Sequence, residues 1–250
     1  MPNHITTIIT TDSAEHLKII IDTVAGDGDQ LFDFNRVIPK PGGFKDTSGH
    51  MGLIDKARAL VGIGHKGNTV DDGALSELMS NLSQSNFNRA VAEPLRDIEE
   101  IDIIADMARN YMISGHVYWY DWNSANWGTK WNAYDVVIND ASIKIETAWS
   151  CPTTVLEALS KMLPHIPISV RYADEDTGCN CGSFELMGGS IVSQDIAPRH
   201  ADMTPEEKYK WIKFALAITH PETTPEKQGY DTNGEYSEEL YDKHNPEEYA

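Results

Sequence analysis

Basic residues are scarce in this chain, and the shortage limits the partners that it can attract. The sequence has 20 Lys and Arg residues against 39 Asp and Glu residues, a formal net charge of −19. Such a charge disfavours nonspecific attraction to nucleic acid or to an anionic membrane surface. It permits attraction to a partner with a basic surface, and it equally suits a protein whose acidic residues only keep it soluble.

Cysteines and long apolar runs are scarce as well. Three cysteines in 250 residues do not indicate a disulfide framework, so we expect a reducing compartment. There is no run of about 18 apolar residues, and we therefore expect no membrane span. The start, MPNHITTIITTDS, has neither a basic segment nor a long apolar segment, which predicts a cytoplasmic protein without a signal peptide.

Common catalytic signatures are missing too. Neither H-E-x-x-H nor G-x-S-x-G occurs, and the nine histidines are dispersed. Residues 62–67 match G-x-G-x-x-G, but dinucleotide binding needs a strand before this motif, and 55–60 has a helical pattern. We interpret the motif as a helix end and a loop. We expect no cofactor, and the pattern favours a non-enzymatic protein over an enzyme.

The cysteines give only a weak pattern for a metal or a nucleophile. Cys179 and Cys181 stand beside three acidic residues at 174–176, but one intervening residue is short for zinc and a second pair is missing. Cys151 precedes a predicted helix, where a thiol pKa can be lowered, yet no partner base is identifiable. We expect no metal site and name no catalytic residue.

Hydrophobic periodicity predicts both strands and helices. The expected strands cover 4–10, 135–139, 143–149, 166–172, 184–187 and 190–193, and 32–41 is expected to be extended. The expected helices cover 13–24, 50–61, 93–112, 152–163 and 206–219, with another starting at Thr69. Asp12 with Glu15 resembles a capping box, as does Thr204 with Glu207. The expected buried face of the helix at 93–112 consists of Leu95, Ile98, Ile101, Ala105, Ala108 and Met112.

This order of elements approximates a ferredoxin-like split βαβ arrangement. We predict an α+β protein with a ferredoxin-like core, an antiparallel sheet, a helical insertion and an acidic C-terminal extension. Residues 1–220 would be one domain with the insertion at about 44–112. Residues 221–250, poor in aliphatic side chains, would be a mobile or loosely docked tail.

Negative charge is concentrated outside the expected core. Residues 71–106 contain nine acidic and two basic residues, and so do residues 222–250. Acidic helix faces can compete with phosphate for a basic groove, although a merely solvated helix face is the plainer alternative. The candidate binding residues on the helix at 93–112 are Glu93, Asp97, Glu100 and Asp102.

Aromatic residues are concentrated in 118–135, YWYDWNSANWGTKWNAYD, which holds four of the six tryptophans. Two interpretations are open. The segment could be a buried aromatic cluster that carries the chain from the insertion into the hairpin of the core. It could instead present a binding surface, because exposed aromatic rings stack on flat ligands. The candidate residues for such a surface are Trp127, Lys130, Trp131 and Tyr134.

Several segments together resemble a known family. They are MPNHITTIIT, FDFNRVIPKP, and NWGTKWNAYD followed by WSCPTTVLEALSKMLP. They resemble the Api92/YubB-like proteins of phages, prophages and plasmids, which carry a ferredoxin-like domain of unknown function. The resemblance covers about 1–43 and 113–197, and it implies this fold and a mobile-element origin. It departs from the family at Cys151, where a proline is usual, and it transfers no catalytic residue.

Our leading hypothesis is a non-enzymatic phage or plasmid protein in the cytoplasm of a bacterial host. It would bind a host protein with a basic surface and inhibit a defence or nucleic-acid-handling system. One alternative is a small-ligand-binding protein or an enzyme with a site near 118–135. Another is an RNA-binding ferredoxin-like module, which the negative charge disfavours.

Overall fold

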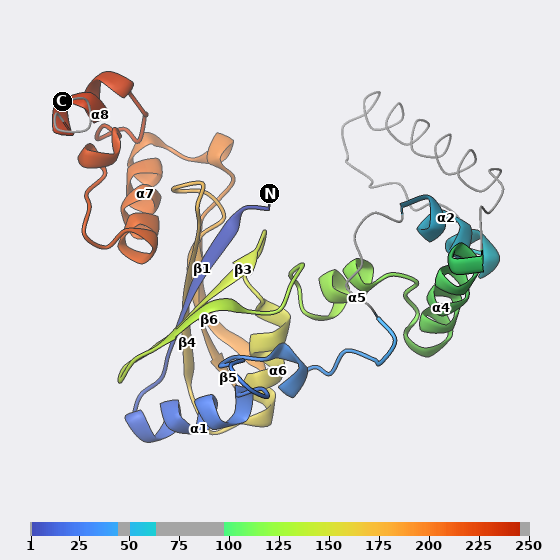
Figure 1. Cartoon of the computed structure of the whole chain (residues 1–250). Coiled ribbons are helices and arrows are strands. Elements are labelled where there is room, and N and C mark those ends of the chain that lie inside the picture. The colour runs from blue at the N-terminus through green and yellow to red at the C-terminus, as the bar shows by residue number, and fades with distance from the viewer. Residues whose placement is uncertain (1, 45–50, 64–97, 246–250) are drawn as a thin grey trace. The chain divides into compact units, whose positions relative to one another are not determined.

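The structure, a computed structural model, describes residues 2–44, 51–63 and 98–245 (Figure 1). The chain forms two compact units. The sheet unit consists of Met1–Pro39 and Ser124–Ala250, and the helical unit is Lys40–Asn123. The helix predicted from Thr69, residues 93–97 of the next predicted helix and residues 64–67 of the glycine motif lie outside the described residues.

The sheet unit contains a six-stranded sheet in the order β2-β3-β1-β4-β5-β6. All neighbouring strands are antiparallel. Its strands are β1 (His4–Thr10), β2 (Tyr134–Ile138), β3 (Ile143–Ala148), β4 (Ile168–Asp174), β5 (Gly182–Met187) and β6 (Ser190–Ile196). One helix follows β1 and another follows β3, which is the βαββαβ order of a ferredoxin-like domain. The predicted α+β, ferredoxin-like fold is confirmed.

Helices cover both faces of this sheet (Figure 1). Ile5 and Ile9 of β1 are fully buried on the face that carries α1 (Ala14–Val24) and α6 (Thr153–Met162). Ile8 points to the other face, where it packs against the cluster that contains Trp211 of α7 (Pro205–Thr219). Two-sided burial explains why β1 is almost continuously apolar or β-branched and alternates only weakly.

The prediction that 32–41 is extended was wrong. Residues Phe34–Arg36 form a 3₁₀-helix, η1. The Asp33 carboxylate accepts a hydrogen bond from the backbone N–H of Asn35 at 2.9 Å and so caps this turn. The alternation of apolar and polar residues that suggested a strand comes from Phe32 and Phe34, which lie on either side of Asp33 and are both fully buried.

The predicted start of α1 was wrong by one residue. Ser13, and not Asp12, is the N-cap, and its hydroxyl accepts from the backbone N–H of His16 at 3.2 Å. Asp12 lies outside the helix and contacts the His16 ring. Both residues can cap a helix, so sequence spacing could not separate them.

The helical unit contains α2 (Met51–Leu60), α4 (Ile98–Ser114) and the first part of α5 (Trp119–Asn126). Its core joins α2 to α4 and consists of Leu53, Ile54, Ala57, Ile104, Met107 and Val117. Arg58 of α2 forms an ion pair of 2.7 Å with Asp121 of α5. Helix α5 was not predicted, because the closely spaced tryptophans of this segment do not show a clear helical repeat of apolar and polar residues.

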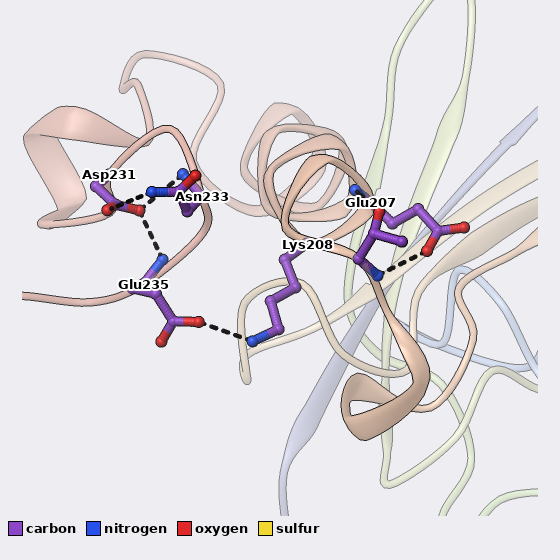
Figure 2. A network of polar contacts seen from close by, with 6 residues as sticks. Glu207, Lys208, Asp231, Asn233 and Glu235 are labelled. Carbon is purple, nitrogen blue, oxygen red and sulfur yellow. Dashed lines mark hydrogen bonds and ion pairs between the residues drawn. The ribbon is translucent and has the colours of Figure 1, made fainter.

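The acidic tail has contacts with α7 (Figure 2). Beyond η2 (His200–Asp202) and α7, the chain forms η3 (Glu226–Gln228) and α8 (Glu238–His244). Lys208 of α7 pairs with Glu235 at 2.8 Å, and Tyr209 donates a hydrogen bond to Glu226 at 2.6 Å. The mobility of the tail stays a prediction. Within the described residues, every helix is too short or too polar to cross a bilayer.

Candidate functional site

Two tryptophans and a lysine form an exposed surface on the sheet unit. Trp131 and Trp149 are 36% and 44% exposed. The Nζ atom of Lys130 lies 4.5 Å from the centre of the Trp131 ring and 4.7 Å from that of Trp149. We call Lys130, Trp131, Tyr134 and Trp149 the indole surface. The position of Lys130 means that both indole rings already hold a cation against their faces.

Tyr134 connects the indole surface to the start of β1. Its ring meets Trp131 edge-on with 6.4 Å between centroids, and its hydroxyl shares a hydrogen bond of 2.8 Å with Nδ1 of His4. Burial, followed by the carboxylates of Glu146, Asp135 and Glu175, raises the pKa of Tyr134 to about 12. The phenol is therefore neutral at physiological pH and serves as a hydrogen-bonding group, not as a phenolate base.

Strained backbone is concentrated around the same surface. Among the described residues, the non-glycine residues with positive φ are Asp135 at 47°, Trp149 at 69° and Asn180 at 42°. Asp135 adjoins Tyr134, and Asn180 donates a hydrogen bond of 3.1 Å to the carbonyl of Trp149. Each such residue costs roughly 1–3 kcal/mol, and such strain occurs frequently at functional sites.

A buried carboxylate holds the strained segments together. Asp174 is 5% exposed. It accepts hydrogen bonds from Asn3 at 3.0 Å and from Asn180 at 2.9 Å. Sequence reasoning missed Asn3, Asp174 and Asn180 as parts of this site. No local signal could have found them, because strand pairing brings the start of β1 to the end of β4.

Glu146 on β3 is the cross-strand neighbour of Tyr134 on β2, and one of its carboxylate oxygens lacks a hydrogen-bond partner. Its side chain is 13% exposed, and Oε1 accepts a hydrogen bond of 2.8 Å from the Thr6 hydroxyl. Lys144 lies 3.4 Å from the same oxygen. Oε2 is buried without a hydrogen-bond partner. A buried acceptor of this kind costs about 1–3 kcal/mol.

The other three tryptophans of 118–135 lie inside. Trp119, Trp122 and Trp127 are 6%, 4% and 2% exposed. The Trp127 ring N–H donates to the carbonyl of Ile38 at 2.9 Å, and its ring meets Phe34 edge-on. Trp127 thus belongs to the core and does not join Lys130, Trp131 and Tyr134 at the surface. The segment divides into a buried part and an exposed part.

The predicted buried face of α4 was wrong. Ile101 and Met112 are 50% and 80% exposed, whereas Ile104 and Met107 are buried against α2. Two apolar series at helical spacing run along this helix, so periodicity alone could not tell which one meets α2. The first series, Ile101, Ala105, Ala108 and Met112, forms a stripe on the outer side of α4.

Acidic side chains flank this apolar stripe. Asp102 is exposed, and Asp106 is 43% exposed and pairs with Arg109. We call Ile101, Asp102, Ala105, Asp106 and Met112 the α4 face. Of the other candidate residues, Glu100 is half-buried on the inner side of α4, and Glu93 and Asp97 lie outside the described residues.

The cysteines are free thiols. Burial raises the pKa of the Cys151 thiol to about 12, which leaves it protonated and a poor nucleophile at neutral pH. The Thr7 hydroxyl lies 3.8 Å from its sulfur. The described part of the chain contains no group of three or more His, Cys, Asp or Glu side chains arranged to hold a metal ion.

Comparison with known families matches residues 126–215 to one described as a ferredoxin-like domain in Api92-like protein. This segment runs from the end of α5 into α7. A solved structure, a protein api92 from Yersinia pseudotuberculosis, aligns with a TM-score of 0.36 and 11% identity. The alignment covers 79% of this chain and 98% of that chain. No curated protein matches.

Proposed function

We propose a non-enzymatic role in protein binding for this chain, whose residues 126–215 match the ferredoxin-like domain of Api92-like proteins, a family of unknown function. The proposed protein is encoded by a phage or plasmid and binds a bacterial host protein with a basic surface. The observation that carries the proposal is the α4 face, where exposed apolar side chains lie beside carboxylates.

The chemistry of the α4 face suits a protein partner. An apolar side chain such as Ile101 or Met112 contributes roughly 1.5–3 kcal/mol when it moves from water into a packed interface. Asp102 and Asp106 beside them add attraction and orientation toward a basic surface. A solvated helix needs only the acidic residues, so the exposed apolar stripe is the feature that a purely solubilising role leaves unexplained.

The proposed partner is a host defence or nucleic-acid-handling protein. Such proteins carry basic grooves that bind phosphate, and carboxylates on a helix can occupy the same grooves. The net charge of −19 supports this choice, because it strengthens attraction to a basic groove at long range. Occupying the groove would inhibit the host protein by competition.

Binding experiments with variants of α4 test the proposal. The tagged protein is used to recover partners from bacterial lysate, and the affinity for each identified partner is then measured at several salt concentrations. We expect Ile101→Ser with Met112→Ser, and Asp102→Asn with Asp106→Asn, each to weaken binding at least about tenfold. The wild-type affinity should also fall as salt rises.

The matched controls lie on the sheet unit. Val192→Ser changes an apolar side chain that is 65% exposed, and Asp140→Asn changes an exposed carboxylate. Both should keep the wild-type affinity. The proposal is contradicted if both α4 double variants bind the recovered partner as tightly as the wild type does. It is also contradicted if no partner with salt-sensitive binding is recovered.

The indole surface supports a second candidate function, binding of a small ligand near 118–135. Its exposed indole rings and strained backbone favour this candidate, whereas the surrounding carboxylates disfavour RNA. Gel shifts with short RNA at low salt distinguish a small-ligand site from an RNA-binding site. Tight binding of RNA would show that the negative charge does not exclude an RNA-binding function.

A further inference from the structure

The indole surface is prepared for a ligand by features that packing alone does not require. Trp149 is 44% exposed, so its indole adds little to the core. Even so, its backbone is held at a positive φ of 69°, a conformation that L residues rarely adopt. We propose that the indole surface binds an arginine side chain of a peptide or protein. This inference stands on the sheet unit alone and does not depend on the α4 face.

Hydrogen bonds fix Trp149 at both backbone groups. Its N–H donates to the Asn3 carbonyl at 2.9 Å, and its carbonyl accepts from the Asn180 side chain at 3.1 Å. Asn180 itself has a positive φ of 42°. The backbone of Asn3, just before β1, and the side chain of Asn180 in the β4–β5 connection both hold this one residue, so the backbone that carries the indole is fixed before any ligand arrives.

The buried Asp174 keeps these supports in place. Its two oxygens accept from Asn3 and Asn180, and its Oδ1 also accepts from the backbone N–H of Asp176 at 3.0 Å. Burying a carboxylate is unfavourable unless it is well hydrogen-bonded, as it is here. The network therefore stabilises a strained and exposed tryptophan, which is the arrangement expected of a preorganised contact residue.

The charges around the surface select a cation. Asp135, Glu175 and Asp176 are exposed carboxylates. Asp135 follows Tyr134 in sequence, and the backbone N–H of Glu175 donates to the His4 carbonyl, beside the Tyr134 hydroxyl. A phosphate-bearing ligand would be repelled here. A guanidinium group stacks on an indole face and offers a planar fork of N–H donors to a carboxylate.

Lys130 shows that the rings suit such a ligand. Its ammonium already lies 4.5 and 4.7 Å from the two ring centres. An incoming guanidinium either displaces this ammonium or stacks on the outer faces of the rings, and in both cases it uses the same attraction between a cation and an indole. Arginine has the advantage over lysine because its planar group is more weakly hydrated and stacks.

Peptide titrations of the full chain test the inference. The probe is an acetylated Gly-Arg-Gly-Arg-Gly amide, and the reference is the same peptide with citrulline in place of arginine, which keeps the shape and loses the charge. Binding is followed by tryptophan fluorescence and by NMR shifts of the indole N–H signals. We expect the citrulline peptide to bind about tenfold more weakly, and shifts confined to Trp131 and Trp149.

Variants locate the site on the protein. Trp131→Leu and Trp149→Leu should each weaken arginine-peptide binding about tenfold, Asp135→Asn should weaken it less, and Val192→Ala should leave it unchanged. If Trp149→Leu does not fold, Trp149→Phe and Asp135→Asn decide the question. The inference is overturned if both peptides bind with equal affinity or if neither binds. It is also overturned if a folded Trp149→Leu variant keeps full affinity, or if the protein prefers a single-stranded RNA oligonucleotide.

Discussion

Tyr134 illustrates how the surroundings of a single residue set its chemistry. Its hydroxyl meets the His4 ring, and its ring meets Trp131. Partial burial and then the carboxylates of Glu146, Asp135 and Glu175 raise its pKa from the ordinary 10.0 to about 12. The unfolded chain loses its phenolic proton at lower pH than the folded chain, so this residue couples stability to alkaline pH.

The coupling predicts how stability changes between pH 10 and pH 12. In this window the unfolded state binds fewer protons at Tyr134 than the folded state, so the free energy of unfolding falls as pH rises. Urea unfolding at several pH values should show that Tyr134→Phe loses less stability across the window than the wild type. Tyr236→Phe, altered at a tyrosine that is 59% exposed, is the control. Parallel pH profiles for the wild type and Tyr134→Phe would refute the coupling.

At the scale of the elements, docking of the acidic tail requires that its loop at residues 231–235 lies close to α7 (Figure 2). Asp231 accepts hydrogen bonds from the backbone N–H groups of Asn233 and Glu235 and so shapes a tight loop. Gly234 in this loop has a φ of 77°, and a Cβ there would lie 2.6 Å from the Cβ of Lys208. Glycine is thus required twice, for its conformation and for its lack of a side chain.

We expect Gly234→Ala to weaken docking of the tail by about 2 kcal/mol or more, because strain and a steric clash add. Limited trypsin digestion at Lys227 should become several-fold faster, while α7 and the sheet stay protected. Gly28→Ala is the matched control, since its φ of 64° gives similar strain but no atom lies within 4 Å of the new Cβ. If the two variants are digested at the same rate as the wild type, the tail does not depend on this contact.

At the scale of the whole molecule, the chain leaves the sheet unit after Pro39 and returns to it at Ser124. The hydrogen bond of 2.9 Å between the Trp127 ring and the Ile38 carbonyl joins the two ends of this excursion. Both residues lie in the sheet unit, so this hydrogen bond joins the start and the end of the excursion within one unit. This arrangement supports the proposal that the helical segment is an insertion in a ferredoxin-like domain.

Removal of the helical unit tests that proposal. Residues 40–123 are replaced by a Gly/Ser linker of about eight residues, which spans about 15 Å. We expect the remaining sheet unit to unfold cooperatively on heating and to give a dispersed NMR spectrum, because Trp127 still packs on Phe34. A shortened protein with poorly dispersed signals would show that the sheet unit needs the helical unit.

Much of the fold could be predicted from local pattern, whereas the candidate site could not. The strands at 4–10 and 143–148, the helix at 153–162 and the capping box of Thr204 and Glu207 depend on short-range spacing that is visible in the sequence. The prediction of 32–41 failed because two buried aromatic residues around a capping Asp33 imitate the alternation of a strand.

The sequence by itself determined the ferredoxin-like order of elements, the excess of negative charge and the group of tryptophans at 118–135, since each is a property of composition or local period. Only the tertiary structure decided that Ile104 and not Ile101 meets α2, and that Trp131 and Trp149 face solvent while Trp127 is buried. The physical reason is that burial depends on contacts between distant segments. Asn3, Trp149, Asp174 and Asn180 meet only because β1 pairs with both β3 and β4.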